Sequence, residues 1–154
     1  MALLVLYYQP VTAQNISSMK SATIQQLDNR MNEYQNIAGK IWEFAEVGYK
    51  ENKSSALLQE TLRKEGFQVT TGAAGMPTAF IASYGSGSPV IAILAEYDAL
   101  PGLSQQAIPE KKVIAGQDAG HGCGHNLFGT ASVAAAISLK QLMASGQIKG
   151  TLRV

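Results

Sequence analysis

The chain has few of the side chains on which covalent or charge-driven chemistry depends. It contains one cysteine and two histidines in 154 residues, and a single cysteine excludes an internal disulfide framework. Its formal net charge is +1, and it has neither basic runs nor aromatic residues interleaved with basic ones. Charge therefore gives no reason to expect binding to nucleic acid or to a membrane surface. We predict no membrane span, and the length corresponds to about one domain.

The N-terminal residues have the pattern of an export segment. Residues 2–8 form a short apolar run, and Val11 and Ala13 resemble a small-residue cleavage site. A positively charged start is missing, which leaves a buried strand as the alternative interpretation. We predict that residues 1–13 are an export signal. The protein is then periplasmic or secreted, and it is cytoplasmic if the signal is not real.

All the cysteine and histidine side chains occur in one stretch, Gly120–Asn126, where His121, Cys123 and His125 alternate with glycines. Glycine permits positive φ and close approach of the backbone to a ligand, so the pattern predicts a tight loop. A helix is predicted directly after it, over residues 127–143, with Asn126 as its N-cap. A thiolate together with imidazoles suits zinc or another divalent transition metal.

Other interpretations of this stretch imply different chemistry. Cys123 could be a buried structural cysteine, the usual environment of a lone cysteine. It could also be a nucleophile with a histidine base, although catalytic pairs usually come from different elements. A phosphate-binding glycine loop is disfavoured because neither the Walker pattern nor the dinucleotide fingerprint is present. A non-catalytic metal-binding or scaffold module and a thiol hydrolase using Cys123 remain as alternatives to a metal-dependent enzyme.

The remaining pattern predicts an α/β fold with helices packed on a mostly parallel sheet. Apolar residues at three- and four-residue steps predict helices over residues 17–47 and 55–64. Short strands are predicted at 67–71, at 78–84 and from 151 onward. Glu43, Glu46 and Glu51 lie beside the predicted helices and are interpreted as surface or capping carboxylates.

A continuous apolar run at residues 90–95 predicts a strand that is buried on both faces. Glu96 and Asp98 follow it directly. Because α/β sheets place their sites at the carboxyl ends of such strands, these two carboxylates are candidate site residues.

Two of these motifs together resemble a known family. Residues 95–102 (AEYDALPG) followed by residues 120–126 (GHGCGHN) resemble the amidohydrolase branch of the aminoacylase/glutamate-carboxypeptidase metallopeptidase family. Residues 46–51 resemble that family's early signature, and the likeness covers about residues 30–154. The resemblance implies that residues 14–154 are the N-terminal part of a zinc-exopeptidase-like catalytic domain.

The resemblance also implies a set of site residues. It implies two divalent metal ions (zinc, manganese or cobalt), with Cys123 and His125 as ligands. Asp98 would orient a ligand, since metal-binding imidazoles usually donate their other N–H to a carboxylate. Glu96 stands where many relatives have a histidine ligand. Glu96 and His121 are therefore possible supporting residues rather than expected ligands.

The activity that the resemblance implies is hydrolysis of the amide bond in N-acyl or N-aroyl amino acids, with p-aminobenzoyl-glutamate-like compounds or dipeptides as substrates. The full-length protein would be a homodimer or a heterodimer. The family has its general base in a pair of glutamates just beyond the strand that begins at Thr151, and residues 1–154 do not include that pair. We therefore expect residues 1–154 alone to be inactive.

Overall fold

The computed structural model describes residues 13–154, and the predicted export signal lies outside the described residues except for Ala13. The helices are α1 Ala13–Asn29, α2 Met31–Phe44, α3 Asn52–Lys64 and α4 His125–Ala144, with a 3-10 helix at Ala73–Gly75. The strands are β1 Gln68–Thr71, β2 Phe80–Ser86, β3 Val90–Ala92, β4 Leu100–Pro101, β5 Ala119–Gly120 and β6 Gly150–Arg153.

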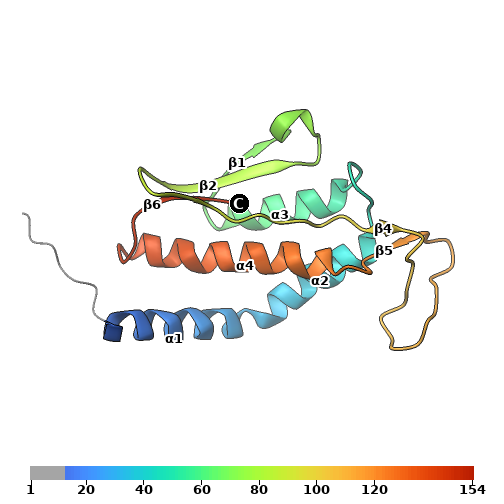
Figure 1. Ribbon diagram of the computed structural model, residues 1–154, viewed down its shortest axis with the longest axis horizontal. Helices are drawn as coiled ribbons and strands as arrows, with labels where there is room; N and C mark the ends of the chain where they lie inside the picture. The colour runs from blue at the N-terminus through green and yellow to red at the C-terminus, as the bar shows by residue number, and fades with distance from the viewer. Residues whose placement is uncertain (1–12) are drawn as a thin grey trace, which may run out of the picture.

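The helices are stacked in layers against one sheet. The sheet has the strand order β1-β2-β6-β3, and α3 and α4 pack against it while α2 packs on both of these helices (Figure 1). Strands β4 and β5 form a separate short ribbon, next to the long loop that precedes α4 (Figure 1). This ribbon lies at the end of the molecule where α4 begins.

The predicted α/β class, with helices packed on a sheet, is confirmed, but the described sheet is mixed rather than mostly parallel. Strands β1 and β2 are antiparallel, as are β2 and β6, whereas β3 and β6 are parallel. The connections account for part of this arrangement. A short connection joins β1 to β2 as a hairpin, which requires antiparallel strands, whereas β3 reaches β6 through the crossover helix α4.

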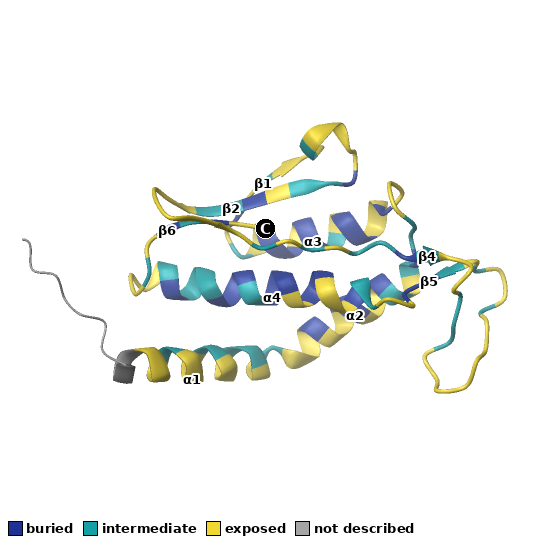
Figure 2. Ribbon diagram, in the orientation of Figure 1, coloured by how far each residue is buried: buried dark blue, intermediate teal, exposed yellow. Residues whose placement is uncertain are grey.

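The prediction that residues 90–95 form a strand buried on both faces is wrong. Strand β3 comprises only Val90–Ala92, and Val90 and Ile91 are each 56% exposed. The inward side chains of the sheet, among them Ala82 and Leu152, join the core below it, whereas Ile81 faces outward. Among the described residues only one face of the sheet is covered by helices (Figure 2), so an apolar run here does not imply burial on both faces.

The single helix predicted over residues 17–47 is two helices. Arg30 has φ −108° and ψ 10°, which ends α1 before α2 begins. Its guanidinium lies 2.9 Å from the carboxylate of Glu33 and 2.6 Å from that of Glu65, beyond the end of α3. The break changes the direction of the chain (Figure 1), and the ion pair to Glu65 ties the start of α2 to α3.

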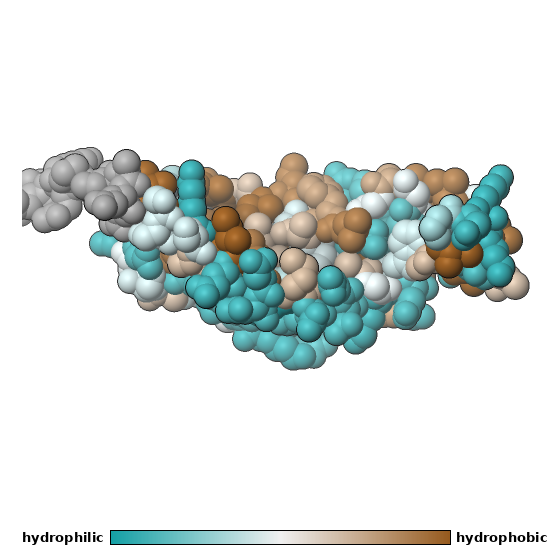
Figure 3. Space-filling view, turned by 90° about the horizontal axis from the view of Figure 1, so that it is seen from below, coloured by the Kyte–Doolittle hydropathy of each residue, from teal (hydrophilic) through white to brown (hydrophobic). Residues whose placement is uncertain are grey.

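Helix α1 packs more loosely than α2. Ile37 and Ile41 of α2 are buried in the core, whereas Ile16 and Ile24 of α1 are exposed. An apolar groove runs between α1 and α4, and its lining includes Ile16, Met19, Ile24, Leu139 and Leu142. Apolar side chains gather on this face of the molecule (Figure 3). Helix α1 therefore contributes less to the core than the other helices.

Helix α4 is the central helix of the core. Val133 and Ile137 are fully buried, and the helix contacts α1, α2, α3 and the sheet. By length and hydropathy it is also the one helix among residues 13–154 that is long and apolar enough to cross a membrane, which the sequence analysis did not anticipate. Half of its apolar window is buried inside the fold, as in the core helix of a globular domain.

Candidate metal centre

The glycine-rich loop forms a tight turn that starts α4. The Gly124 N–H donates to the carbonyl of His121 at 3.1 Å, and Gly124 has φ 85° at the N-cap position. The prediction of Asn126 as N-cap is therefore wrong. Asn126 lies in the first turn of α4, buried, and its Nδ2 donates to the carbonyl of Ala38 in α2. Its amide thus ties α4 to α2 instead of capping the helix.

The segment that carries the two candidate carboxylates runs alongside α4 and is held at both ends. Ser132 Oγ donates to the carbonyl of Leu94 at 2.9 Å, and the N–H of Ala99 donates to the carbonyl of Glu46 at 2.7 Å. Between these points, the carbonyl of Glu96 lies against Gly129, where a Cβ atom would come within 2.6 Å of the carbonyl oxygen. A glycine inside α4 therefore allows the segment to approach the helix.

His125, the first residue of α4, lies between the two carboxylates. Its Nδ1 is 2.7 Å from Asp98 Oδ1, and its Nε2 is 3.0 Å from Glu96 Oε2. One ligand atom of each residue lies within 4.8 Å of the others, which is close enough for a single metal ion. Asp98 and His125 are partly buried, whereas Glu96 is exposed. The structure thus brings together three of the five candidate site residues.

This geometry indicates how His125, Asp98 and Glu96 could bind a metal ion. When Nδ1–H donates to Asp98, the imidazole is fixed in the tautomer whose Nε2 carries a free lone pair. That lone pair and the Glu96 carboxylate then lie side by side. Nitrogen and oxygen ligands of this kind are accepted by zinc, manganese and cobalt. The donor set therefore fits a divalent metal ion.

His121 faces the core rather than this group. It is 3% exposed, its Nε2–H donates to the carbonyl of Ile41 at 2.9 Å, and its ring lies beside Trp42. Burial lowers the pKa of His121 below its ordinary value, which favours the neutral ring. Its Nδ1 has no hydrogen-bond partner in the described part of the chain. These contacts hold His121 in the core, and its role as a supporting residue of the metal site stays a prediction.

Cys123 is exposed, which is at odds with the alternative of a buried structural cysteine. It does not belong to the three-residue group around His125. Whether its thiolate joins His125 in binding metal stays a prediction. The three side chains of the loop therefore have different surroundings: His121 is buried in the core, Cys123 is exposed, and His125 lies beside Glu96 and Asp98.

Sequence reasoning missed the role of Gly129 beneath the carboxylate segment. A signal for it existed, because an isolated glycine inside a predicted helix often marks close packing against another part of the backbone. Thr78, which bonds to Tyr97 and Glu51 near this segment, had no comparable signal in the sequence.

No protein-family model matches the chain, but individual proteins of similar sequence are found. It is 48% identical over 122 residues to a subunit of the p-aminobenzoyl-glutamate hydrolase of Escherichia coli, a match that covers 78% of this chain and 25% of that protein. It is 35% identical over 109 residues to thermostable carboxypeptidase 1 of Saccharolobus solfataricus, covering 67% and 27%. The chain belongs to the metallopeptidase and amidohydrolase family of these relatives. The family assignment from the sequence motifs is thereby confirmed.

Two solved structures match the fold of the chain. The fold matches a dinuclear metal-binding peptidase of the M20 family from Bacillus subtilis with a TM-score of 0.67 and 26% identity, over 79% of this chain and 33% of that one. A structure from methicillin-resistant Staphylococcus aureus matches with a TM-score of 0.70 at 21% identity, over 86% and 33%. The chain spans about a quarter of the length of the curated relatives it matches.

Proposed function

We propose that this chain supplies part of the metal site of a hydrolase that cleaves the amide bond of N-acyl or N-aroyl amino acids. The observation that supports it most directly is the position of His125 between Asp98 and Glu96. The relatives named as a p-aminobenzoyl-glutamate hydrolase and a carboxypeptidase support an amide bond next to a free carboxylate as the target.

In this proposal His125 offers its Nε2 lone pair to a divalent metal ion while Asp98 holds the ring in place. Cys123, two residues away, supplies a thiolate ligand, and the Glu96 carboxylate neutralises charge beside the ion. A bound metal ion would supply Lewis acidity toward the scissile carbonyl and would activate a water molecule. The dinuclear site of the Bacillus subtilis relative supports two ions rather than one.

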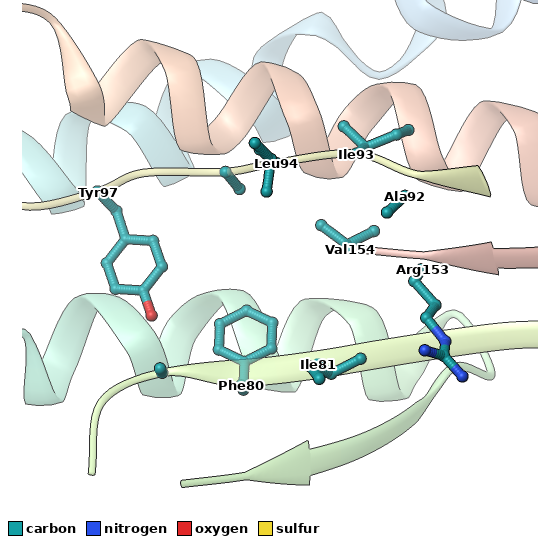
Figure 4. Close-up of a pocket in the computed structure, with 10 residues that line it drawn as sticks. Phe80, Ile81, Ala92, Ile93, Leu94, Tyr97, Arg153 and Val154 are labelled. Atoms are coloured by element: carbon teal, nitrogen blue, oxygen red, sulfur yellow. The ribbon is translucent and has the colours of Figure 1, made fainter. Parts of the chain in front are cut away.

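We propose that the general base and the remaining ligands lie outside residues 1–154, because the chain spans about a quarter of the length of the relatives it matches. Beside the last residues of β6, a groove is lined on one side by Phe80 and Ile81 and on the other by Ile93 and Leu94 (Figure 4). Strand β6 pairs with β3 in parallel register.

The same relatives support a proposal for the substrate and for the oligomeric state. An N-acyl or N-aroyl amino acid such as p-aminobenzoyl-glutamate would place its carbonyl at the metal and would need cationic or N–H donors for its carboxylate. Because the Escherichia coli relative is named as one subunit of its enzyme, we propose that the full-length protein acts as a homodimer or a heterodimer.

The test is chelation followed by metal add-back on the full-length protein. We expect removal of metal to abolish hydrolysis of p-aminobenzoyl-glutamate and of N-acetyl amino acids, and zinc, manganese or cobalt to restore it. The reason is that Lewis acidity and water activation both depend on the ion. The measurements are metal content by mass spectrometry and amide hydrolysis by product release.

A Cys123→Ala variant separates metal from thiol chemistry. We expect this variant to contain less metal than the wild type and to lose most of its activity, and the wild type to be inactive after chelation. Activity that survives complete chelation but disappears on alkylation of Cys123 would instead establish a thiol hydrolase. An intact protein that neither binds metal nor cleaves either substrate would establish the non-catalytic alternative.

A further inference from the structure

In the sequence Tyr97 stands between Glu96 and Asp98, the two carboxylate residues of the proposed metal site, but its side chain points away from that site. Its hydroxyl donates to the backbone carbonyl of Thr78 at 2.6 Å, and its ring is stacked on Phe80. Figure 4 shows the ring projecting from its segment toward the side on which Phe80 lies. Glu96 and Asp98, on either side of Tyr97 in the chain, both reach His125 instead. The Tyr97 side chain is thus bonded on one side of this backbone segment, and the Glu96 and Asp98 side chains lie on the other side.

Thr78 is the centre of a buried polar cluster. Its carbonyl accepts a second hydrogen bond, from Ser55 Oγ at 2.6 Å, and its own hydroxyl donates to Glu51 Oε2 at 2.6 Å. Thr78, Ser55 and Glu51 are all buried. Charged acceptors make stronger hydrogen bonds than neutral ones, so the buried Glu51 carboxylate fixes the position of Thr78 and, through it, of Tyr97.

Glu46, which precedes α3 as Glu51 does, holds the other end of the segment that carries Glu96 and Asp98. The carbonyl of Glu46 accepts the N–H of Ala99, and the carboxylate of Glu46 accepts the backbone N–H groups of Lys53 and Ser54 at the start of α3. Glu46 and Glu51, for which the proposed chemistry has no direct use, therefore hold the segment at Ala99 directly and at Tyr97 through Thr78.

We propose that Tyr97 and Thr78 are positioning residues for the metal site: through the buried Glu51 they hold the segment so that Glu96 and Asp98 reach His125. The inference rests on the proposed function, since it assigns these residues a role only if the group around His125 binds metal. Burial raises the pKa of the Tyr97 phenol above its ordinary value, so Tyr97 stays protonated and remains a donor at neutral pH.

The test measures Co²⁺ affinity and the absorption spectrum of bound Co²⁺ in the full-length protein. Tyr97→Phe keeps the ring on Phe80 and removes only the hydrogen bond to Thr78. We expect Co²⁺ binding to weaken about tenfold and the spectrum to change, because loss of an outer partner of a metal ligand typically costs about 10–100-fold in affinity. The matched control is Tyr49→Phe, the same change at a side chain that is 73% exposed, and it should leave both measurements unchanged.

A second pair of variants tests the link to Glu51. Thr78→Val removes the donor to the Glu51 carboxylate at nearly constant shape, and we expect it to weaken Co²⁺ binding, whereas Thr78→Ser keeps the hydroxyl and should restore wild-type affinity and spectrum. Thermal unfolding of the metal-free variants is measured in parallel. Variants that lose stability but keep wild-type Co²⁺ affinity and spectrum would overturn the inference while leaving the proposed function intact. A wild-type protein that binds no metal would overturn both.

Discussion

Replacing Gly129 by alanine is expected to destabilise the protein and to weaken metal binding. Alanine inside a helix is normally better than glycine by up to about 1 kcal/mol. At Gly129, however, a Cβ atom would come within 2.6 Å of the Glu96 carbonyl oxygen and 3.3 Å of Tyr97 Cβ. A backbone carbonyl cannot rotate away as a flexible side chain can, so either α4 or the carboxylate segment must move. Overpacking of this kind typically costs about 1–3 kcal/mol.

Gly39 provides the matched control for Gly129. It lies inside α2 and is exposed, and apart from its own helix backbone no atom of the described residues lies within 4 Å of the place where a Cβ would stand. Gly39→Ala should therefore stabilise the protein by about 0.5–1 kcal/mol. Denaturant unfolding of both variants gives the two free energies, and Co²⁺ titration shows whether Gly129→Ala displaces Glu96. A stabilised Gly129→Ala variant with unchanged metal affinity would show that the segment does not depend on this close contact.

The fold could be predicted to the extent that it depends on local pattern. The alanine- and leucine-rich run after the glycine loop predicted α4, and the turn residues separated the strands around Tyr84 and Val90 correctly. The break at Arg30 could not be predicted, because neither proline nor glycine marks it and one of its ion pairs is to Glu65, far along the chain. The exposure of β3 was missed for a similar reason, since apolar content does not report which face of a sheet is covered.

The candidate site was predictable in composition but not in arrangement. Asp98 and His125 were singled out by motif, and the structure places them 2.7 Å apart across 27 positions of sequence. Glu96 was predicted only as a possible supporting residue, because many relatives have a histidine at this position, and it reaches the other nitrogen of the same ring. The role of Thr78 could not be predicted, because its contact with Tyr97 is made by a backbone carbonyl, which every residue type has.

Replacing His125 by alanine is expected to abolish most metal binding and activity while leaving the fold intact. His125 is partly exposed and its ring contacts Asp98, Glu96 and Phe128 rather than the core. Its loss removes the nitrogen proposed to bind the ion. We therefore expect Co²⁺ affinity to fall by more than the roughly 10–100-fold that loss of an outer partner costs. The unfolding midpoint of the metal-free protein should stay close to that of the wild type.

His121, four positions earlier in the same loop, should respond in the opposite way. Its ring is buried against Ile41 and Trp42, so His121→Ala leaves a cavity and an unpaired carbonyl. The expected loss of stability is about 2–4 kcal/mol, with metal stoichiometry retained below the unfolding midpoint. His121→Gln keeps an amide N–H for Ile41 and should recover part of the loss. Calorimetry and metal analysis of the three variants decide the assignment, because loss of metal in His121→Gln together with full retention in His125→Ala would exchange the roles of the two histidines.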